Sequence, residues 1–140
     1  MSNYIKQTPT FIRRNARYSD LSINFGLNPF TEDVTRVVDV EAVKRSVKNL
    51  VLTNRYERLL DPRIGGNVRA MLFEPMTALT SSILEDYITD TINNYEPRVS
   101  LQSVVATPDF DRNSYEVTIT FRLDSVEQPV TLEITLERIR

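Results

Sequence analysis

The 140-residue sequence contains no cysteine and no histidine. Without cysteine there are no disulfides and no thiolate chemistry, and zinc sites lose their commonest ligands. Without histidine there is no His-based catalytic triad and no side chain that ordinarily carries protons near neutral pH. We therefore expect no cofactor and no metal site in this protein.

A strong net charge and long apolar runs are also lacking. Lys and Arg total 17 and Asp and Glu total 19, so the net charge is −2. Such a balance creates no field that would favour nucleic acid or an anionic membrane as a partner. No apolar run is long enough to span a membrane, and residues 1–17 lack the hydrophobic core of a signal peptide. We expect no nucleic-acid partner and no membrane partner, and use under cytoplasm-like conditions.

The first 38 residues show no sustained periodicity, although aromatic residues recur among polar and basic ones. We expect an arm or extended segment here. Arg13, Arg14 and Arg17, near Phe11 and Tyr18, offer charge and stacking for single-stranded nucleic acid, but three arginines are too few to be specific. An arm that becomes ordered when it docks on a neighbouring subunit is the better interpretation of this segment. A segment with aromatic residues and no periodicity cannot bury those residues by itself.

Helical spacing of apolar residues occurs twice in the middle of the chain. A first helix is predicted from Asp39, which we interpret as its N-cap. A loop over residues 54–66 separates it from a short helical turn at residues 68–73. A longer helix is predicted over residues 77–94, ended by Pro97 because a proline disfavours helical backbone at the preceding residue. Its apolar stripe comprises Leu79, Ile83, Leu84, Tyr87, Ile88 and Ile92.

The apolar period changes to two in the C-terminal part of the chain. Apolar and polar residues alternate over residues 115–123 and again over residues 130–136, which is typical of half-buried strands. A shorter strand over residues 101–107 and short connecting loops predict a three-stranded antiparallel meander. We therefore expect an α+β domain over residues 39–140, with two main helices packed on one face of the meander.

Several short motifs follow one another in a characteristic order. Glu96-Pro97-Arg98 stands between the long helix and the first strand, Leu72-Phe73-Glu74-Pro75-Met76-Thr77 precedes the helix, and Asp61-Pro62-Arg63-Ile64-Gly65 lies in the loop. In order and spacing they resemble the motifs of phage baseplate wedge proteins and type VI secretion baseplate proteins, often called the sheath-initiator family. The resemblance extends from about residue 18 to the end of the chain.

The resemblance implies a structural protein of a contractile tail, not an enzyme. Its place would be the tail baseplate of a virion, after assembly in the host cytoplasm. The resemblance also implies that Glu96, Pro97 and Arg98 help to anchor the domain to the core bundle of the baseplate wedge, with tail tube or hub proteins as further candidate neighbours. The sheet would accept β-strands from the first ring of the tail sheath protein.

A free sheet edge agrees with strand acceptance, because its unpaired backbone groups are a template for another strand. Thr131, Glu133 and Thr135 share one direction along the last strand and are, with the Glu-Pro-Arg residues, our candidate partner-binding residues. The sequence does not tell whether their N–H groups point into the sheet or out of it. The strand over residues 101–107 is the other candidate edge.

A local role for the Glu-Pro-Arg motif is the alternative to partner binding. The motif would then be a helix stop followed by a Glu96–Arg98 ion pair worth less than about 1 kcal/mol at an exposed surface. Against this, the planar fork of an arginine suits pairing within an interface. If Arg98 anchors the domain to a wedge partner, we expect Arg98→Ala to leave the isolated fold nearly intact and to weaken incorporation into baseplates.

Two further functional classes are weighed against the structural one. Glu74, Glu85, Asp86 and Asp90 could in principle supply an acid and a base, as in a lysozyme-like hydrolase. Nothing in their spacing places two of them across a cleft, so we expect no peptidoglycan hydrolysis by the purified protein. A free-standing protein-binding adaptor outside a tail is the other alternative, and copurification with sheath and wedge proteins would distinguish it.

Overall fold

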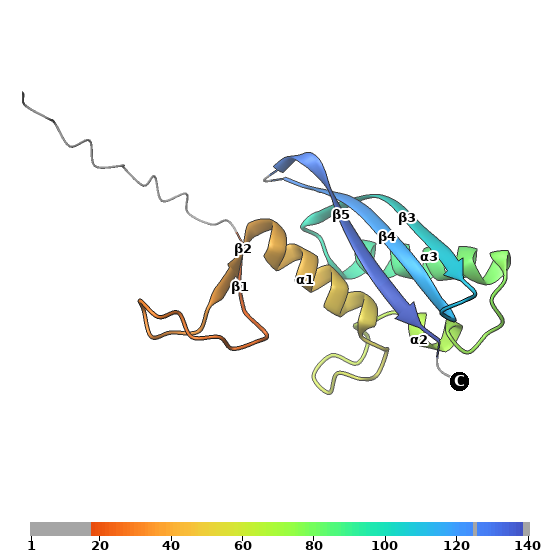
Figure 1. The fold of residues 1–140 in the computed structure, drawn as a ribbon, viewed down its shortest axis with the longest axis horizontal. Helices are drawn as coiled ribbons and strands as arrows, with labels where there is room; N and C mark the ends of the chain where they lie inside the picture. Colours follow the sequence, from red (N-terminus) through yellow and green to blue (C-terminus); the bar gives the residue numbers. More distant parts are fainter. Residues whose placement is uncertain (1–17, 125, 139–140) are drawn as a thin grey trace, which may run out of the picture.

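The computed structural model describes residues 18–124 and 126–138 of the chain. Two main helices pack on one face of a three-stranded antiparallel sheet, which confirms the expected α+β architecture (Figure 1). No helix in these two described ranges is long and apolar enough to cross a membrane. The elements, in chain order, are β1 (Ser19–Leu21), β2 (Arg36–Val38), α1 (Asp39–Leu52), α2 (Val68–Met71), α3 (Ala78–Tyr95), β3 (Val99–Asp109), β4 (Ser114–Leu123) and β5 (Val126–Glu137).

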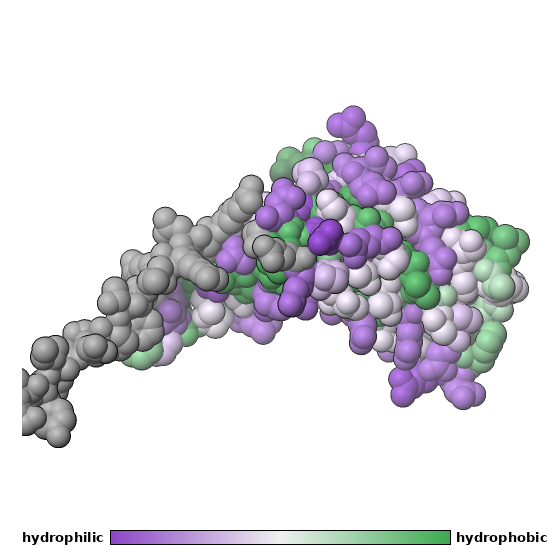
Figure 2. Space-filling view, turned by 90° about the horizontal axis from the view of Figure 1, so that it is seen from above, coloured by the Kyte–Doolittle hydropathy of each residue, from purple (hydrophilic) through white to green (hydrophobic). Residues whose placement is uncertain are grey.

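The long helix α3 begins and ends as its sequence predicts. The hydroxyl of Thr77 accepts a hydrogen bond from the Thr80 N–H at 3.1 Å, and the helix ends just before Pro97. Leu84, Ile88 and Ile92 are fully buried against the sheet. Leu79 was expected on the same stripe but is exposed. It lies in the first turn, beyond the part of the helix that the sheet covers, and Figure 2 shows apolar surface gathered at this end of the molecule.

The start of α1 differs from the prediction in one detail. Val38, not Asp39, is the residue before the helix, and no side chain caps the helix. The Asp39 carboxylate instead accepts a hydrogen bond from the Tyr18 N–H at 3.3 Å, and the Asp39 N–H donates to the Tyr18 carbonyl at 2.8 Å. The cap prediction is therefore wrong, because this aspartate joins the helix to the arm.

The sheet has the strand order β3-β4-β5, so β3 and β5 are both edge strands. Both are longer than the sequence pattern predicts, since β3 begins at Val99 and β5 at Val126. Register shifts interrupt the ladder between Leu101 and Ser103 and between Phe121 and Leu123. The helix-facing side of β4 carries the centre of the core, including the fully buried side chains of Tyr115, Val117, Ile119 and Phe121.

The predicted arm is only partly within the described residues. Residues 1–17, with their three arginines, lie outside the described ranges. Residues 18–38 contain β1 and β2, which pair in antiparallel fashion with Ser19 opposite Val38, a pairing that the sequence pattern did not indicate. Exposed apolar side chains in residues 18–38 include those of Leu21, Ile23, Phe25, Leu27 and Phe30.

Candidate interaction surfaces

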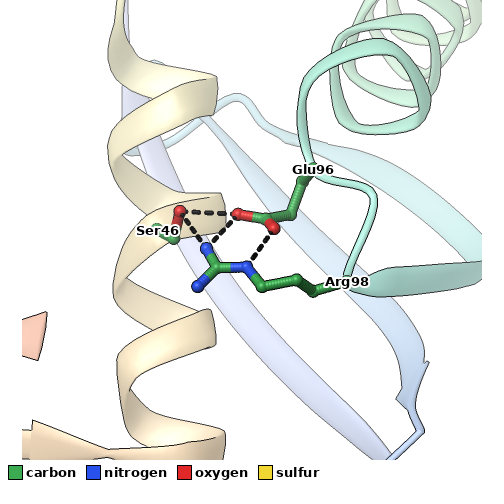
Figure 3. Close-up of polar contacts among 3 residues, drawn as sticks. All are labelled: Ser46, Glu96 and Arg98. Atoms are coloured by element: carbon green, nitrogen blue, oxygen red, sulfur yellow. Dashed lines mark hydrogen bonds and ion pairs between the residues drawn. The ribbon is translucent and has the colours of Figure 1, made fainter. Parts of the chain in front are cut away.

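The Glu-Pro-Arg corner, Glu96 to Arg98, joins α3 to β3 and faces the middle of α1. Arg98 Nε donates to Glu96 Oε1 at 2.6 Å and Arg98 Nη2 donates to Glu96 Oε2 at 2.6 Å, a bidentate pair. Ser46 of α1 completes the network, because its hydroxyl donates to Glu96 Oε2 at 2.6 Å and accepts from Arg98 Nη2 at 3.0 Å (Figure 3). The local ion pair is thus present, and it also connects the corner to α1.

Burial makes this pair different from a surface ion pair. The side chain of Glu96 is only 4% exposed, whereas that of Arg98 is 36% exposed. Burial by itself raises the pKa of Glu96, but the hydrogen bonds from Arg98 and Ser46 outweigh it and hold that pKa below its ordinary value. The hydrogen bonds to Glu96 raise the pKa of Arg98 in turn. The corner is therefore a charged, hydrogen-bonded joint inside the domain.

Arg98 also contacts the arm. Its guanidinium carbon lies 5.5 Å from the centre of the Tyr18 ring, a cation–π distance. Its Nη1 atom makes no hydrogen bond to any residue in the described part of the chain. The sequence pattern pointed to Glu96 and Arg98 but did not connect them with Ser46 or Tyr18, which lie 52 and 80 positions from Arg98 along the chain.

The stability contributed by Glu96 should depend on pH. Its folded-state pKa is lowered, so the contribution is fully present above the unfolded value of about 4.3 and is lost as the pH falls through the folded value. We expect the melting temperature of the native chain to exceed that of Glu96→Gln at neutral pH, and this difference to shrink as the solution is acidified below that value. Thermal unfolding of both proteins across this range measures it. A constant difference would contradict the assignment.

Side chains on β5 alternate as predicted. Val130, Ile134 and Leu136 are buried toward the helices, whereas the three predicted edge residues Thr131, Glu133 and Thr135 are exposed on the opposite face. The structure thus places the corner and the edge residues in two separate surfaces, one at the α3–β3 junction and one on the last strand.

One hydrogen bond just beyond the end of the β4–β5 ladder shows which N–H groups of β5 point away from β4. The Arg138 N–H donates to the Asn113 carbonyl at 3.1 Å, which continues the register in which Ser114 faces Glu137. That register is unbroken from there to the pair of Phe121 and Val130. Because bonded and non-bonded pairs alternate in an antiparallel ladder, the N–H groups that point away from β4 are those of Thr131, Glu133, Thr135 and Glu137.

The other edge, β3, is partly closed. By the same alternation the N–H of Ala106 points outward, and it donates to Glu85 Oε1 of α3 at 2.8 Å. The next outward position is Pro108, which has no N–H. Figure 1 shows α3 alongside β3, with β5 at the other margin of the sheet. The open edge with a row of unused donors is therefore β5.

The carboxylates considered for catalysis do not come together in an enclosed site. Glu85 accepts the Ala106 N–H, and Glu74, Asp86 and Asp90 are exposed. Among the described residues no group of three or more His, Cys, Asp or Glu side chains is placed to hold a metal ion. What the geometry provides is a buried charged joint and an open strand edge.

The fold of this chain recurs in solved baseplate structures. In solved structures the same fold occurs in the anti-feeding prophage baseplate, with a TM-score of 0.60 and 21% identity over 88% of this chain and 87% of that one. It also occurs in the postcontracted pyocin R2 baseplate, with a TM-score of 0.57 and 18% identity over 71% of this chain and 97% of that one. A Geobacter sulfurreducens protein, named only as a candidate tail lysozyme, has a TM-score of 0.68 and 22% identity over 74% of this chain and 96% of its own.

Sequence comparison identifies the family. Residues 37–128, more than half of the chain, match the family described as Baseplate wedge protein gp25. The baseplate wedge protein gp25 of Enterobacteria phage T4 is 29% identical over 119 residues, which are 85% of this chain and 88% of that protein. The chain belongs to the gp25 family of baseplate wedge proteins, components of the baseplates of contractile tail systems. The predicted family and baseplate location are thereby confirmed.

Proposed function

We propose that this wedge protein templates the tail sheath by accepting a sheath β-strand along the open edge of β5. The observation that carries the proposal is the row of four outward N–H groups on β5, from Thr131 to Glu137, which bond to no other described residue. An added strand would satisfy these donors and the carbonyls beside them. An unprotected edge of this length is a liability unless a partner covers it.

We also propose that the Glu-Pro-Arg corner anchors the domain to the core bundle of the wedge. The support is the partly exposed side chain of Arg98, whose guanidinium is held in place by Glu96 and Ser46 while its Nη1 remains directed away from both (Figure 3). A held guanidinium loses little rotamer entropy when it donates to a partner's carbonyl or carboxylate. The wedge core bundle is the expected partner, with hub or tail tube proteins as further candidates.

Glu133→Pro is the direct test of strand addition. It removes one outward N–H and leaves every inward bond of β5 in place, so we expect a folded protein that enters baseplates but does not start a sheath. Electron microscopy of assembled particles should show tubes on baseplates without sheaths. Glu133→Val is the matched control, because it removes the same side chain and keeps the N–H. It should give sheathed tails.

Normal sheaths on baseplates that contain folded Glu133→Pro would exclude strand addition at this edge. Unsheathed tails with both variants would instead assign the function to the Glu133 side chain. Copurification with sheath and wedge proteins separates the baseplate role from that of a free-standing adaptor.

A lysozyme-like activity is the competing proposal, prompted by the Geobacter protein named as a candidate tail lysozyme. A likeness at 22% identity establishes the shared fold only. We propose a structural and non-enzymatic role, because the Glu85 carboxylate is committed to the Ala106 N–H and the remaining candidates are exposed. A general acid would need burial or a neighbouring charge to adjust its pKa.

A further inference from the structure

A groove with a mixed apolar and polar lining lies beside the C-terminal half of β5. Its volume is about 220 Å³, whereas a cavity needs only about 10 to 15 Å³ by the same measure to hold one water molecule. Its polar lining consists of Asn54, Arg69, Thr135 and Glu137. Its apolar lining is contributed by the end of α1, by α2 with the residue after it, and by β5, through Val51, Leu52, Val68, Leu72 and Leu136. All of these are buried except Leu52, which is 48% exposed.

The groove adjoins the outward donors of the edge strand. Thr135 and Glu137, whose N–H groups point away from β4, line the same groove as Leu136. Side chains of a β-strand alternate between the two faces of its sheet. On a strand added beside β5, the residue opposite Leu136 would therefore point to the helix side, as Leu136 does, and into the groove.

We propose that this groove is a side-chain pocket that selects the added strand, an inference that rests on the proposed function. The occupant is a large aliphatic or aromatic side chain at the position opposite Leu136. A second apolar residue is required two positions away, opposite the buried Ile134. The residues between them face the exposed side, next to Thr135 and Glu133, and are free to be polar.

This pocket supplies the specificity that backbone pairing lacks. Main-chain hydrogen bonds hold any extended segment, whereas pockets for alternate side chains distinguish one sequence from another. Burial of one large apolar side chain corresponds to roughly ten- to hundredfold in affinity. A strand with a charged residue opposite Leu136 would lose that contribution and would have to desolvate its charge against Leu136, Val51 and Leu72.

Leu52→Asp tests the pocket without altering the core, because Leu52 stands at the partly exposed mouth of the groove. We expect folded protein that enters baseplates and a fraction of sheathed tails reduced at least about tenfold. The matched control is Leu79→Asp, the same change at an exposed helical leucine on α3, which does not line the groove. It should leave sheath formation unchanged.

A cross-linking experiment identifies the occupant independently of any loss of function. Since the chain has no cysteine, the Leu52→Cys variant can be labelled at one site with a photoreactive benzophenone before baseplates and sheaths are reconstituted. We expect the label to capture a sheath segment with apolar residues at alternate positions, identified by mass spectrometry. A label at position 79, introduced by Leu79→Cys, should not capture that segment.

The outcomes separate this inference from the proposed function. Sheathed tails with Leu52→Asp, together with unsheathed tails for Glu133→Pro, would overturn the pocket and keep strand addition. Sheathed tails with both variants would overturn both proposals. Capture of this chain's own residues 1–17, or of a sheath segment without alternate apolar residues, would overturn the assigned occupant.

Discussion

Ile134→Pro is expected to unfold most of the domain or to lower its melting temperature by roughly 15 °C or more. The Ile134 N–H is assigned to the bond with β4, and its side chain is 4% exposed. Loss of a buried isoleucine side chain typically costs about 2 to 5 kcal/mol, and a lost ladder bond with an unsatisfied carbonyl adds about 1 to 3 kcal/mol. Domains of this size are stable by only about 5 to 15 kcal/mol.

Two controls assign the effect to the direction of the N–H group. Ile134→Ala loses the same side chain but keeps the bond, so it should be clearly more stable than Ile134→Pro. Glu133→Pro, one position earlier, should remain within about 1 kcal/mol of the native chain because its N–H points outward. Chemical denaturation of the three variants measures all these differences. If Glu133→Pro unfolds and Ile134→Pro does not, the alternation on β5 is the reverse of that described here.

Arg98→Ala is expected to destabilise the isolated domain by about 3 kcal/mol. The substitution leaves the carboxylate of Glu96 buried with Ser46 as its remaining side-chain partner, and breaking a buried ion pair typically costs about 3 to 5 kcal/mol. The lower end applies because the Arg98 side chain is 36% exposed. This replaces the sequence-based expectation of a nearly intact fold, since the guanidinium is part of the domain's own joint.

A double-mutant cycle tests this account of the corner. Adding Glu96→Gln to Arg98→Ala removes the unpaired charge, so the double variant should be more stable than the sum of the single effects predicts. Denaturant unfolding of the four proteins gives the coupling. Additive effects would show that Glu96 and Arg98 act separately.

Arg98→Ala also tests partner anchoring, provided that it is compared with a second variant of equal stability. Val47→Ala empties a fully buried position on α1 and should destabilise the fold by a similar amount. If Arg98 also binds the wedge bundle, Arg98→Ala should enter baseplates less well than Val47→Ala, since loss of a charged interface pair costs about 2 to 5 kcal/mol of binding. Equal incorporation would restrict the motif to its local role.

The sequence by itself determined the local elements of this protein. The helical spacing over residues 77–94 and Pro97 after it predicted α3 to within a residue, because apolar periodicity and helix stops are local features of the chain. The alternation over residues 130–136 predicted which side chains of β5 are buried, because successive side chains of a strand point to opposite faces. The motif order predicted the family that the comparison then identified.

Only the tertiary structure decided how these elements meet. Ser46 and Arg98 are 52 residues apart, and Glu85 and Ala106 are 21 apart, so no local pattern encodes either contact. The pairing of β1 with β2 and the groove beside β5 likewise depend on segments brought together by the fold. The alternating sequence pattern showed that successive N–H groups on β5 point in opposite directions, but not which of them point toward β4. That depends on the register between β4 and β5, which is set by packing of the whole sheet against the helices.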